Sequence, residues 1–492
     1  MKPTMRPLAP SPGDVPRRPL RILTLIAALL PLAAEAHGQP RADLAARVDS
    51  LFAEWDRPGS PGCALGVVQD GRLVYARGYG YANLDHDVPI SPKTVFYIAS
   101  VSKQFTAASI VLLAQQGALS LDDDVRTYIP ELPDYGAPIT IRHLIHHTSG
   151  LRDYLTLMLL AGMRLEDVHT DEEVLDLVTR QEALNFTPGE RHLYSNTGYL
   201  LMAEIVRRVS GKSLREFADE HIFRPLGMTS THFHDDRTMV VRNRAMAYAR
   251  NEDGSYRLDM WTNFDKVGSG GLLSSVEDLA LWDLNAEHHT VGGAALREQM
   301  LERGVLNNGD TLDYAFGLVL GEYRGLRTVS HSGGSMGFRA HHLRFPDERF
   351  AVICLCNLGS IDAAGLARRV ADIYLEDRFP EPPQATRASG PAPRAGDAAS
   401  PFPAPAEAAL AEFAGRYHSD ELRVTYTLAV ERGRLVLHGR NAPPATLQAI
   451  GPDRFRADGV ALRFVRHDSR NITGFVLDAG RVLGLRFQRV PE

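Results

Sequence analysis

The chain has 492 residues, of which 44% are hydrophobic and 23% charged, and its formal net charge is −6. This length and composition indicate a globular protein of about two to four domains. The weakly acidic charge balance excludes strong electrostatic attraction to nucleic acid or to an anionic membrane, so partners of those two classes are not expected.

The N-terminus has the pattern of a cleaved export signal. Three arginines between positions 17 and 21 precede the apolar run 22–34, and Ala34-Glu35-Ala36 has the small residues that a signal peptidase reads. The run is shorter than the ~20 apolar residues of a transmembrane helix. We therefore expect residues 1–36 to be a signal peptide, the mature protein to be periplasmic or secreted, and no stable membrane span to remain; a single membrane anchor is the alternative.

Residues 41–378 are expected to form one domain with strands at its two ends and helices between them. A helix over 41–55 precedes strands at 64–69 and 72–79, which the hairpin signal Asp70-Gly71 joins. Helical apolar spacing then marks residues 102–116, 171–182, 197–209, 214–221 and 276–286. Strands return at 316–320, 327–331, 339–345 and 350–355, before a helix at 363–374. The simplest packing is an α/β fold, in which a mainly antiparallel sheet is flanked by helices and a helical subdomain lies beside it.

A second domain is expected after a linker. Residues 379–406 are rich in proline and alanine, with eight prolines between 380 and 405, and are expected to be extended. Residues 407–492 contain short strand-like runs separated by turns, the clearest at 422–430, 434–438, 461–465, 472–477 and 482–487. Many short strands in so few residues predict a small all-β barrel.

The chain has three cysteines, Cys63, Cys354 and Cys356. The last two are separated by one residue in a strand-like run, so they share one face of it. We expect all three to be buried as small apolar residues. A disulfide between Cys63 and one of the others is possible but is not predicted.

The first group of reactive residues is Ser100-Val101-Ser102-Lys103 at the start of a helix. A spacing of three puts Ser100 and Lys103 on one helical face. A serine hydroxyl is a weak nucleophile unless a base takes its proton, and a desolvated lysine amine can be that base. The alternative is a helix cap beside a surface lysine.

The second group is Tyr194-Ser195-Asn196, directly before a helix. A tyrosine can accept and return a proton if cations lower its pKa, and Lys103 would be such a cation. Asn196 offers an amide donor for a substrate carbonyl and an acceptor for Lys103. A simple helix cap at Asn196 is the alternative.

The third group is His331-Ser332-Gly333-Gly334 at the end of a strand. An edge strand here can bind an extended acyl substrate, and the two glycines allow its backbone to come close. The backbone N–H groups of Gly334 and Ser100 would form an oxyanion hole.

Together the three groups, in this order and at these separations, resemble the serine β-lactamase and penicillin-binding-protein family. The closest likeness is to its class C-like branch of esterases and D-aminopeptidases. Flanking segments such as Ile141-Arg-His-Leu-Ile-His-His-Thr-Ser-Gly-Leu151 and Tyr314-Ala-Phe-Gly317 agree with this. The segment Gly415-Arg-Tyr-His-Ser-Asp-Glu-Leu422 resembles the lipocalin-like barrel that many members carry.

The resemblance implies a role for each residue of the site. Ser100 would be the acylated nucleophile, Lys103 its activating partner, and Tyr194 the base and proton shuttle. The substrate would be bound by Asn196 and by the strand His331, Ser332 and Gly333, with Gly334 completing the oxyanion hole. No cofactor and no metal are expected, the partner would be a small-molecule or short-peptide substrate, and the oligomeric state is not indicated.

His331 departs from the family pattern, because β-lactamases carry a lysine at this position. A lysine would be a permanent cation for the substrate carboxylate, whereas histidine is mostly neutral at pH 7. We therefore expect a serine hydrolase that acts through an acyl-enzyme on small esters, amides or D-amino acid peptides. The alternatives are a β-lactamase or DD-carboxypeptidase, or a low-turnover penicillin-recognising sensor whose barrel binds the ligand.

Two further patterns could indicate metal sites. His143, His146 and His147 have the helical spacing of zinc ligands, and Asp122-Asp123-Asp124 has the charge of a calcium site. No glutamate completes a protease-type zinc motif, and the aspartates lack the spacing and glycine of a calcium loop. Structural roles are expected for both.

Overall fold

The computed structural model describes residues 39–380, 406–457, 459–467 and 471–491. The predicted signal peptide and almost all of the predicted linker lie outside these residues. Residues 1–43 form a unit of their own, of which only the start of helix α1 (Gln39–Phe52) is described. No helix in the described part of the chain is long and apolar enough to cross a membrane.

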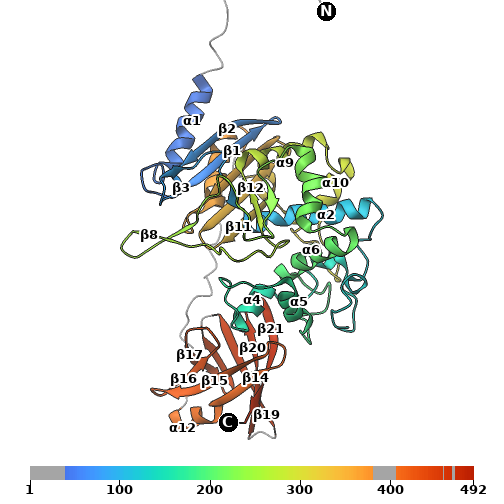
Figure 1. Cartoon of the computed structure of the whole chain (residues 1–492), viewed down its shortest axis with the longest axis vertical. Coiled ribbons are helices and arrows are strands. Elements are labelled where there is room, and N and C mark those ends of the chain that lie inside the picture. Colours follow the sequence, from blue (N-terminus) through green and yellow to red (C-terminus); the bar gives the residue numbers. More distant parts are fainter. Residues whose placement is uncertain (1–38, 381–405, 458, 468–470, 492) are drawn as a thin grey trace, which may run out of the picture. The chain divides into compact units, whose positions relative to one another are not determined.

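The two ends of the first domain pair in one antiparallel sheet, as the sequence predicts. Its strand order is β10-β11-β12-β13-β1-β2. The six strands are β1 (Cys63–Gln69), β2 (Arg72–Tyr79), β10 (Val319–Tyr323), β11 (Leu326–Ser335), β12 (Phe338–Phe345) and β13 (Phe350–Cys356). Every residue of β13, and all of β1 except its last, is buried, which explains their continuous apolar sequences. The first and last strands of the domain, β1 and β13, thus lie side by side in the interior of the sheet (Figure 1).

The strand expected at 316–320 begins three residues later, at Val319. The reason lies at Gly317, which has φ +71°. A Cβ at this position would lie 2.5 Å from the backbone nitrogen of Gln104, so residues 316–318 pack against the helix that begins at Lys103 instead of extending the sheet.

Helices cover both faces of the sheet and form the middle of the domain. They are α2 (Lys103–Gln115), α3 (Ile141–Ile145), α4 (Tyr154–Leu160), α5 (Asp171–Thr179), α6 (Asn196–Ser210), α7 (Leu214–Ala218), α8 (Arg224–Leu226), α9 (Val276–His288), α10 (Gly293–Met300) and α11 (Ala363–Tyr374). Short strands connect them, namely β3 (Tyr81–Asn83), β4 (Val88–Pro89), β5 (Phe96–Tyr97), β6 (His232–Phe233), β7 (Tyr248–Arg250), β8 (Tyr256–Leu258) and β9 (Leu272–Ser274). Helices α1 and α11 pack on one face of the sheet and α9 on the other.

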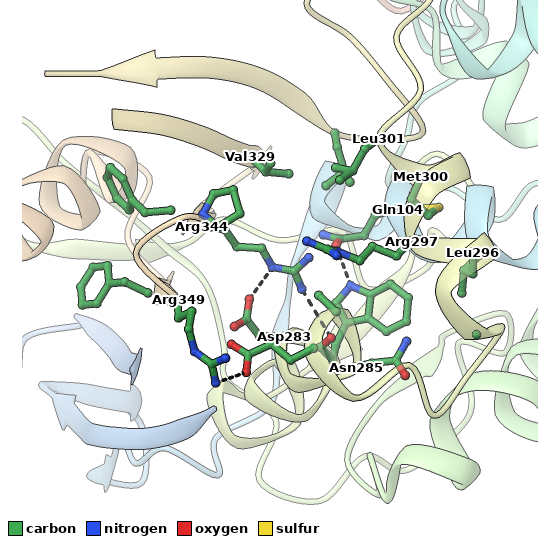
Figure 2. Close-up of a pocket in the computed structure, with 18 residues that line it drawn as sticks. Gln104, Asp283, Asn285, Leu296, Arg297, Met300, Leu301, Val329, Arg344 and Arg349 are labelled. Atoms are coloured by element: carbon green, nitrogen blue, oxygen red, sulfur yellow. Dashed lines mark hydrogen bonds and ion pairs between the residues drawn. The ribbon is translucent and has the colours of Figure 1, made fainter. Parts of the chain in front are cut away.

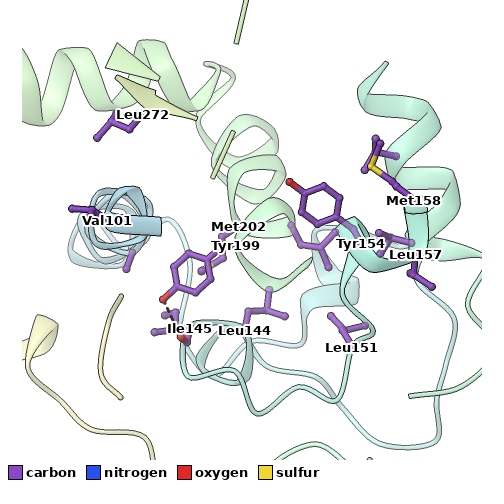
Figure 3. Close-up of a cluster of buried hydrophobic side chains, with 14 of the residues drawn as sticks. Val101, Leu144, Ile145, Leu151, Tyr154, Leu157, Met158, Tyr199, Met202 and Leu272 are labelled. Atoms are coloured by element: carbon purple, nitrogen blue, oxygen red, sulfur yellow. Dashed lines mark hydrogen bonds between the residues drawn. The ribbon is translucent and has the colours of Figure 1, made fainter. Parts of the chain in front are cut away.

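Helix α2 runs through the core of the helical region. Its residues from Lys103 to Leu113 are buried on all sides, as expected for a helix without a polar face. Figure 3 shows Tyr154 and Tyr199 among the apolar side chains around it, with the Tyr199 hydroxyl donating to the Ile145 carbonyl at 3.0 Å. This packing fixes the helices that carry the candidate site residues.

All three cysteines are buried, as predicted, and two of them form a disulfide that the sequence did not predict. Cys63 on β1 and Cys356 on β13 are direct cross-strand partners, and their sulfurs are bonded. Cys354 is a free thiol with its Sγ 3.6 Å from that of Cys356. The pairing follows from the register of two strands that are distant in sequence, which local patterns do not contain.

The described residues from 407 onward form the closed barrel that the sequence predicts. After α12 (Glu407–Leu410), its strands are β14 (Gly415–Ser419), β15 (Val424–Glu431), β16 (Arg434–His438), β17 (Ala445–Gly451), β18 (Arg454–Ala457), β19 (Val460–His467), β20 (Asn471–Ala479) and β21 (Val482–Val490). Strand β14 pairs with β21 and closes the barrel. Buried rings contact one another inside it, including Tyr417, Phe464 and Phe475. Its interior is thus packed with side chains.

The barrel bonds directly to the helical region of the first domain. Arg152 Nη1 lies 2.5 Å from Glu421 Oε2, and both side chains are at most 5% exposed. Tyr426 donates its hydroxyl to the Leu160 carbonyl at 2.6 Å, and the Asn441 side chain donates to the Gly162 carbonyl at 2.8 Å. These contacts hold one part of the barrel against helix α4.

Candidate active site

A cavity of about 740 Å³ lies between the helical region and strand β11. It is lined by six of the eight residues that the sequence predicted for the site, namely Ser100, Tyr194, Asn196, His331, Ser332 and Gly334. Of the other two, Lys103 is fully buried in contact with Ser100, and Gly333 packs against the segment that carries Ser100. The structure therefore brings all three sequence motifs to one place.

Ser100 lies in a short 3₁₀ turn, η1 (Ala99–Ser102), directly before α2. Ala99 has φ +48°, a left-handed conformation that is uncommon for a residue with a side chain. Such strained backbone persists only where the surroundings enforce it, and it occurs frequently at functional sites. Here it sets the direction in which Ser100 leaves the preceding strand.

The Lys103 amine makes three polar contacts. Its Nζ lies 3.2 Å from Ser100 Oγ, 2.9 Å from Asn196 Oδ1 and 2.5 Å from the Ser269 carbonyl oxygen. Burial lowers the pKa of Lys103 well below its usual value, and the nearby Arg481 lowers it further against the opposing charge of Asp153. A neutral amine has two N–H groups and one lone pair. In this neutral form, with its N–H groups directed at Asn196 and Ser269, the amine would turn its lone pair toward the Ser100 hydroxyl.

Tyr194 packs beside this amine, with Lys103 Nζ 4.8 Å from its ring centroid. Its buried hydroxyl makes no hydrogen bond of good geometry within the described residues, but it lies near enough to the Ser100 side chain for that group to affect its pKa. Burial raises the pKa of Tyr194, and the smaller opposing effects of Ser100 and Arg481 do not reverse this. The condition for Tyr194 to act as a base, that cations lower its pKa, is therefore not met, because burial of the hydroxyl outweighs them. At neutral pH, Tyr194 is a protonated phenol.

His331 is held as a neutral imidazole. Its Nδ1–H donates to the Ser332 carbonyl at 2.6 Å, and its Nε2 accepts from the Tyr314 hydroxyl at 3.1 Å. Burial lowers the pKa of His331 to about 3, and Lys103 adds to this effect. Strand β11 therefore presents no cation at position 331.

Gly333 allows β11 to pack directly on the segment before Ser100. A Cβ at position 333 would lie 2.2 Å from the Ile98 carbonyl oxygen, a distance that no side chain tolerates. Gly334 differs, since a Cβ there would come no closer than 3.7 Å to Arg339. What Gly334 supplies to the cavity is its backbone.

Sequence reasoning missed several residues that surround this group. Ser269 supplies a backbone carbonyl to Lys103, and Asp153 accepts from the Asn196 backbone N–H at 2.7 Å. The His147 ring packs at a tilt against Tyr194, with ring centroids 4.2 Å apart, and its Nδ1 accepts from the Ser195 backbone N–H. Tyr314 belongs to the segment Tyr314-Ala-Phe-Gly317, which carries part of the family resemblance, so the sequence could have indicated it as a site residue. Arg481 comes from the barrel, and nothing in its local sequence marks it.

The residues of the two possible metal motifs have other roles. His143 accepts from the Thr140 backbone and caps α3, whereas His146 packs on Phe316 with ring centroids 5.1 Å apart. Asp122 pairs with Arg142, and Asp124 caps a short turn. Within the described residues, the only group with ligand atoms close enough for a metal ion is the three cysteines, two of which are joined in the disulfide.

A second, smaller cavity of about 100 Å³ lies beside α9 and α10 (Figure 2). Leu296, Met300 and Val329 form much of its wall. Arg344 pairs with Asp283, and the Trp282 indole donates to Gln104 at 2.7 Å. No serine or cysteine lines this cavity. The cavity at Ser100 is the better candidate for chemistry.

The sequence model described as "Beta-lactamase" matches residues 47–375. The chain belongs to the beta-lactamase family. This agrees with the resemblance found from the three motifs, and with the fold described above. Within the family, the chain is 34% identical over 305 residues to penicillin-binding protein 4* of Bacillus subtilis, a match that covers 59% of this chain and 67% of that protein.

A D-aminopeptidase of Gluconobacter oxydans is 30% identical over 316 residues, covering 64% of this chain and 59% of the relative. The chain therefore spans about three fifths to two thirds of the length of these family members. Among solved structures, the octameric penicillin-binding protein homologue from Pyrococcus abyssi has a TM-score of 0.60 at 24% identity, covering 91% of this chain and 99% of that one. D-Amino acid amidase from Ochrobactrum anthropi, solved with L-phenylalanine amide, has a TM-score of 0.58 at 23% identity over 68% of this chain and 99% of its own.

Proposed function

We propose that the protein is a serine hydrolase that works through an acyl-enzyme on Ser100. The observation that carries this proposal is the environment of Lys103. Its amine is buried, its pKa is lowered, and its two N–H groups have acceptors other than the serine. A base in this state can take the hydroxyl proton as Ser100 attacks an acyl carbon.

The other residues take roles that follow from their positions. Tyr194, protonated at neutral pH, supplies a proton to the departing group and recovers it through Lys103. The backbone N–H groups of Ser100 and Gly334 stabilise the oxyanion. Asn196 orients Lys103 and the substrate amide, while His331, Ser332 and Gly333 form the edge along which the acyl chain lies.

The proposed substrates are small esters, amides or D-amino acid peptides. Two features support this class over β-lactams. The relatives include D-aminopeptidases and a D-amino acid amidase, and the neutral His331 leaves strand β11 without a charge at the position where it would hold the carboxylate of a β-lactam. The packed interior of the barrel also disfavours a sensor that binds its ligand there.

Labelling with a fluorophosphonate probe, followed by mass spectrometry, tests the nucleophile. Wild-type protein should gain one adduct on Ser100, and Ser100→Ala should gain none. Lys103→Met, which keeps the buried volume but removes the amine, should label at least a hundredfold more slowly while keeping its circular dichroism spectrum. Equal labelling of wild type and Ser100→Ala would refute the proposal.

We further propose that the protein is exported and that residues 1–36 are removed. The Cys63–Cys356 disulfide supports this, because such bonds persist mainly in oxidising compartments. Protein recovered from the periplasm or medium should have a new N-terminus near residue 37. After denaturation without reductant it should expose one reactive thiol, that of Cys354. An intact N-terminus in all fractions, or three reactive thiols, would contradict export.

A further inference from the structure

The turn between β20 and β21 brings a barrel residue to the candidate active site. Arg481 lies at the tip of this hairpin and lines the same cavity as Ser100 and Tyr194. Its guanidinium carbon is 4.7 Å from the centroid of the Tyr194 ring. The site is therefore built from both domains.

The hairpin is held in place by hydrogen bonds to the helical region. The Arg481 carbonyl accepts from the Asp153 backbone at 3.3 Å and from the Asn185 side chain at 3.0 Å. The Leu483 backbone N–H donates to Asn185, and the Leu483 carbonyl accepts from Arg152. Position 481 is thus fixed by its backbone, which leaves the arginine side chain available for another role.

The guanidinium keeps donors for a ligand. Its side chain is 43% exposed, and its nearest carboxylate, that of Asp153, is 3.8 Å from Nη1. The Asp153 oxygens already accept from the Asn196 and Thr156 backbones at 2.7 and 3.1 Å. Arg481 therefore offers a planar fork of N–H groups that fits a carboxylate.

The position over Tyr194 indicates which part of the substrate Arg481 meets. In the proposed function, on which this inference rests, Tyr194 delivers a proton to the departing group. A side chain on the face of that ring therefore lies beside the leaving-group half of the substrate. We propose that Arg481 binds the C-terminal carboxylate of a short peptide whose scissile bond is attacked by Ser100. The barrel thereby supplies the cation that β11 lacks at His331.

Protection of Ser100 from a fluorophosphonate probe tests this assignment without requiring turnover. The labelling rate of the full chain is measured with increasing D-alanyl-glycine, and separately with D-alanyl-glycinamide, which differs only in lacking the carboxylate. Wild type should be protected by the dipeptide at about tenfold to a hundredfold lower concentration than by its amide, the range expected for hydrogen bonds to a charged group. Arg481→Gln should reduce this ratio to near one, and Arg481→Lys should give an intermediate value.

Arg486→Gln is the matched control, because Arg486 lies on β21, the strand that follows Arg481, with its side chain exposed, and does not line the cavity. It should keep the wild-type ratio. Equal protection by dipeptide and amide in the wild type, or an unchanged ratio in Arg481→Gln, would overturn the inference. An equal loss of protection by both ligands would also overturn it, since Arg481 would then act through Tyr194. Absence of any labelling in the wild type would instead refute the proposed function.

Discussion

Gly333 on β11 lies so close to Ile98 that a Cβ on the glycine would be 2.2 Å from the Ile98 carbonyl oxygen. Gly333→Ala should therefore separate the strand from the segment that carries Ser100. We expect a loss of more than a hundredfold in the Ser100 labelling rate, with a decrease of about 1–3 kcal/mol in the free energy of unfolding. The comparison variant is Gly321→Ala on β10, where a Cβ comes no closer than 3.4 Å to another atom. A Gly333→Ala protein with wild-type labelling would show that this close approach is dispensable.

The pH dependence of labelling should report the state of Lys103. Burial lowers the pKa of this amine, and only the neutral amine accepts a proton from Ser100. The rate should therefore rise with pH through the lowered pKa and become constant well below pH 10.5. Rates of Ser100 labelling measured between pH 5 and pH 10 would show this plateau. A rate that still rises tenfold per pH unit at pH 10 would mean that Lys103 has an ordinary pKa.

Several buried histidines should make the protein sensitive to mild acid. Burial lowers the pKa of His331 to about 3 and those of His341, His146 and His234 to about 4. Because the unfolded chain binds these protons from about pH 6.5 downwards, stability is full above that pH and is lost as the pH falls toward 4. Each histidine adds up to about 1.4 kcal/mol per pH unit to the slope.

Urea unfolding at half-unit intervals from pH 7 to pH 4 measures this slope. Replacing His341 by Gln, which retains a hydrogen-bonding group near Ser332, should make the curve shallower. A free energy of unfolding that is constant between pH 6.5 and pH 4.5 would show that the histidines are accessible to protons in the folded protein.

The buried pair Arg152–Glu421 should contribute strongly to the attachment of the barrel. Glu421→Gln leaves the Arg152 charge uncompensated at a site where the arginine side chain is 1% exposed. Removing one member of a buried pair costs about 3–5 kcal/mol. Arg423→Ala breaks the neighbouring Arg423–Asp176 pair, whose side chains are 65% and 46% exposed, and should cost less than about 1 kcal/mol. Similar urea midpoints for the two variants would contradict this.

The sequence was sufficient for the parts of the site that lie close together along the chain. Ser100 and Lys103 are three residues apart in the sequence. The strand-like runs at the two ends of the first domain also indicated that these ends pair in one sheet. The pKa of Tyr194 could not be predicted, because it depends on burial by segments distant in sequence. The carbonyl of Ser269 gave no signal, since any residue can supply one. The position of Arg481 in the site could not be predicted either, because it depends on how the two domains pack together.

The pairing of β1 with β13 has a consequence for biosynthesis. Strand β1 cannot complete its pairing in the sheet until the ribosome has made residue 356, because Cys63 on β1 pairs with Cys356 on β13. Contacts this distant in sequence slow folding and prolong the exposure of unpaired strand edges. The apolar strand β1 therefore has to be kept from aggregation while nearly three hundred residues follow it.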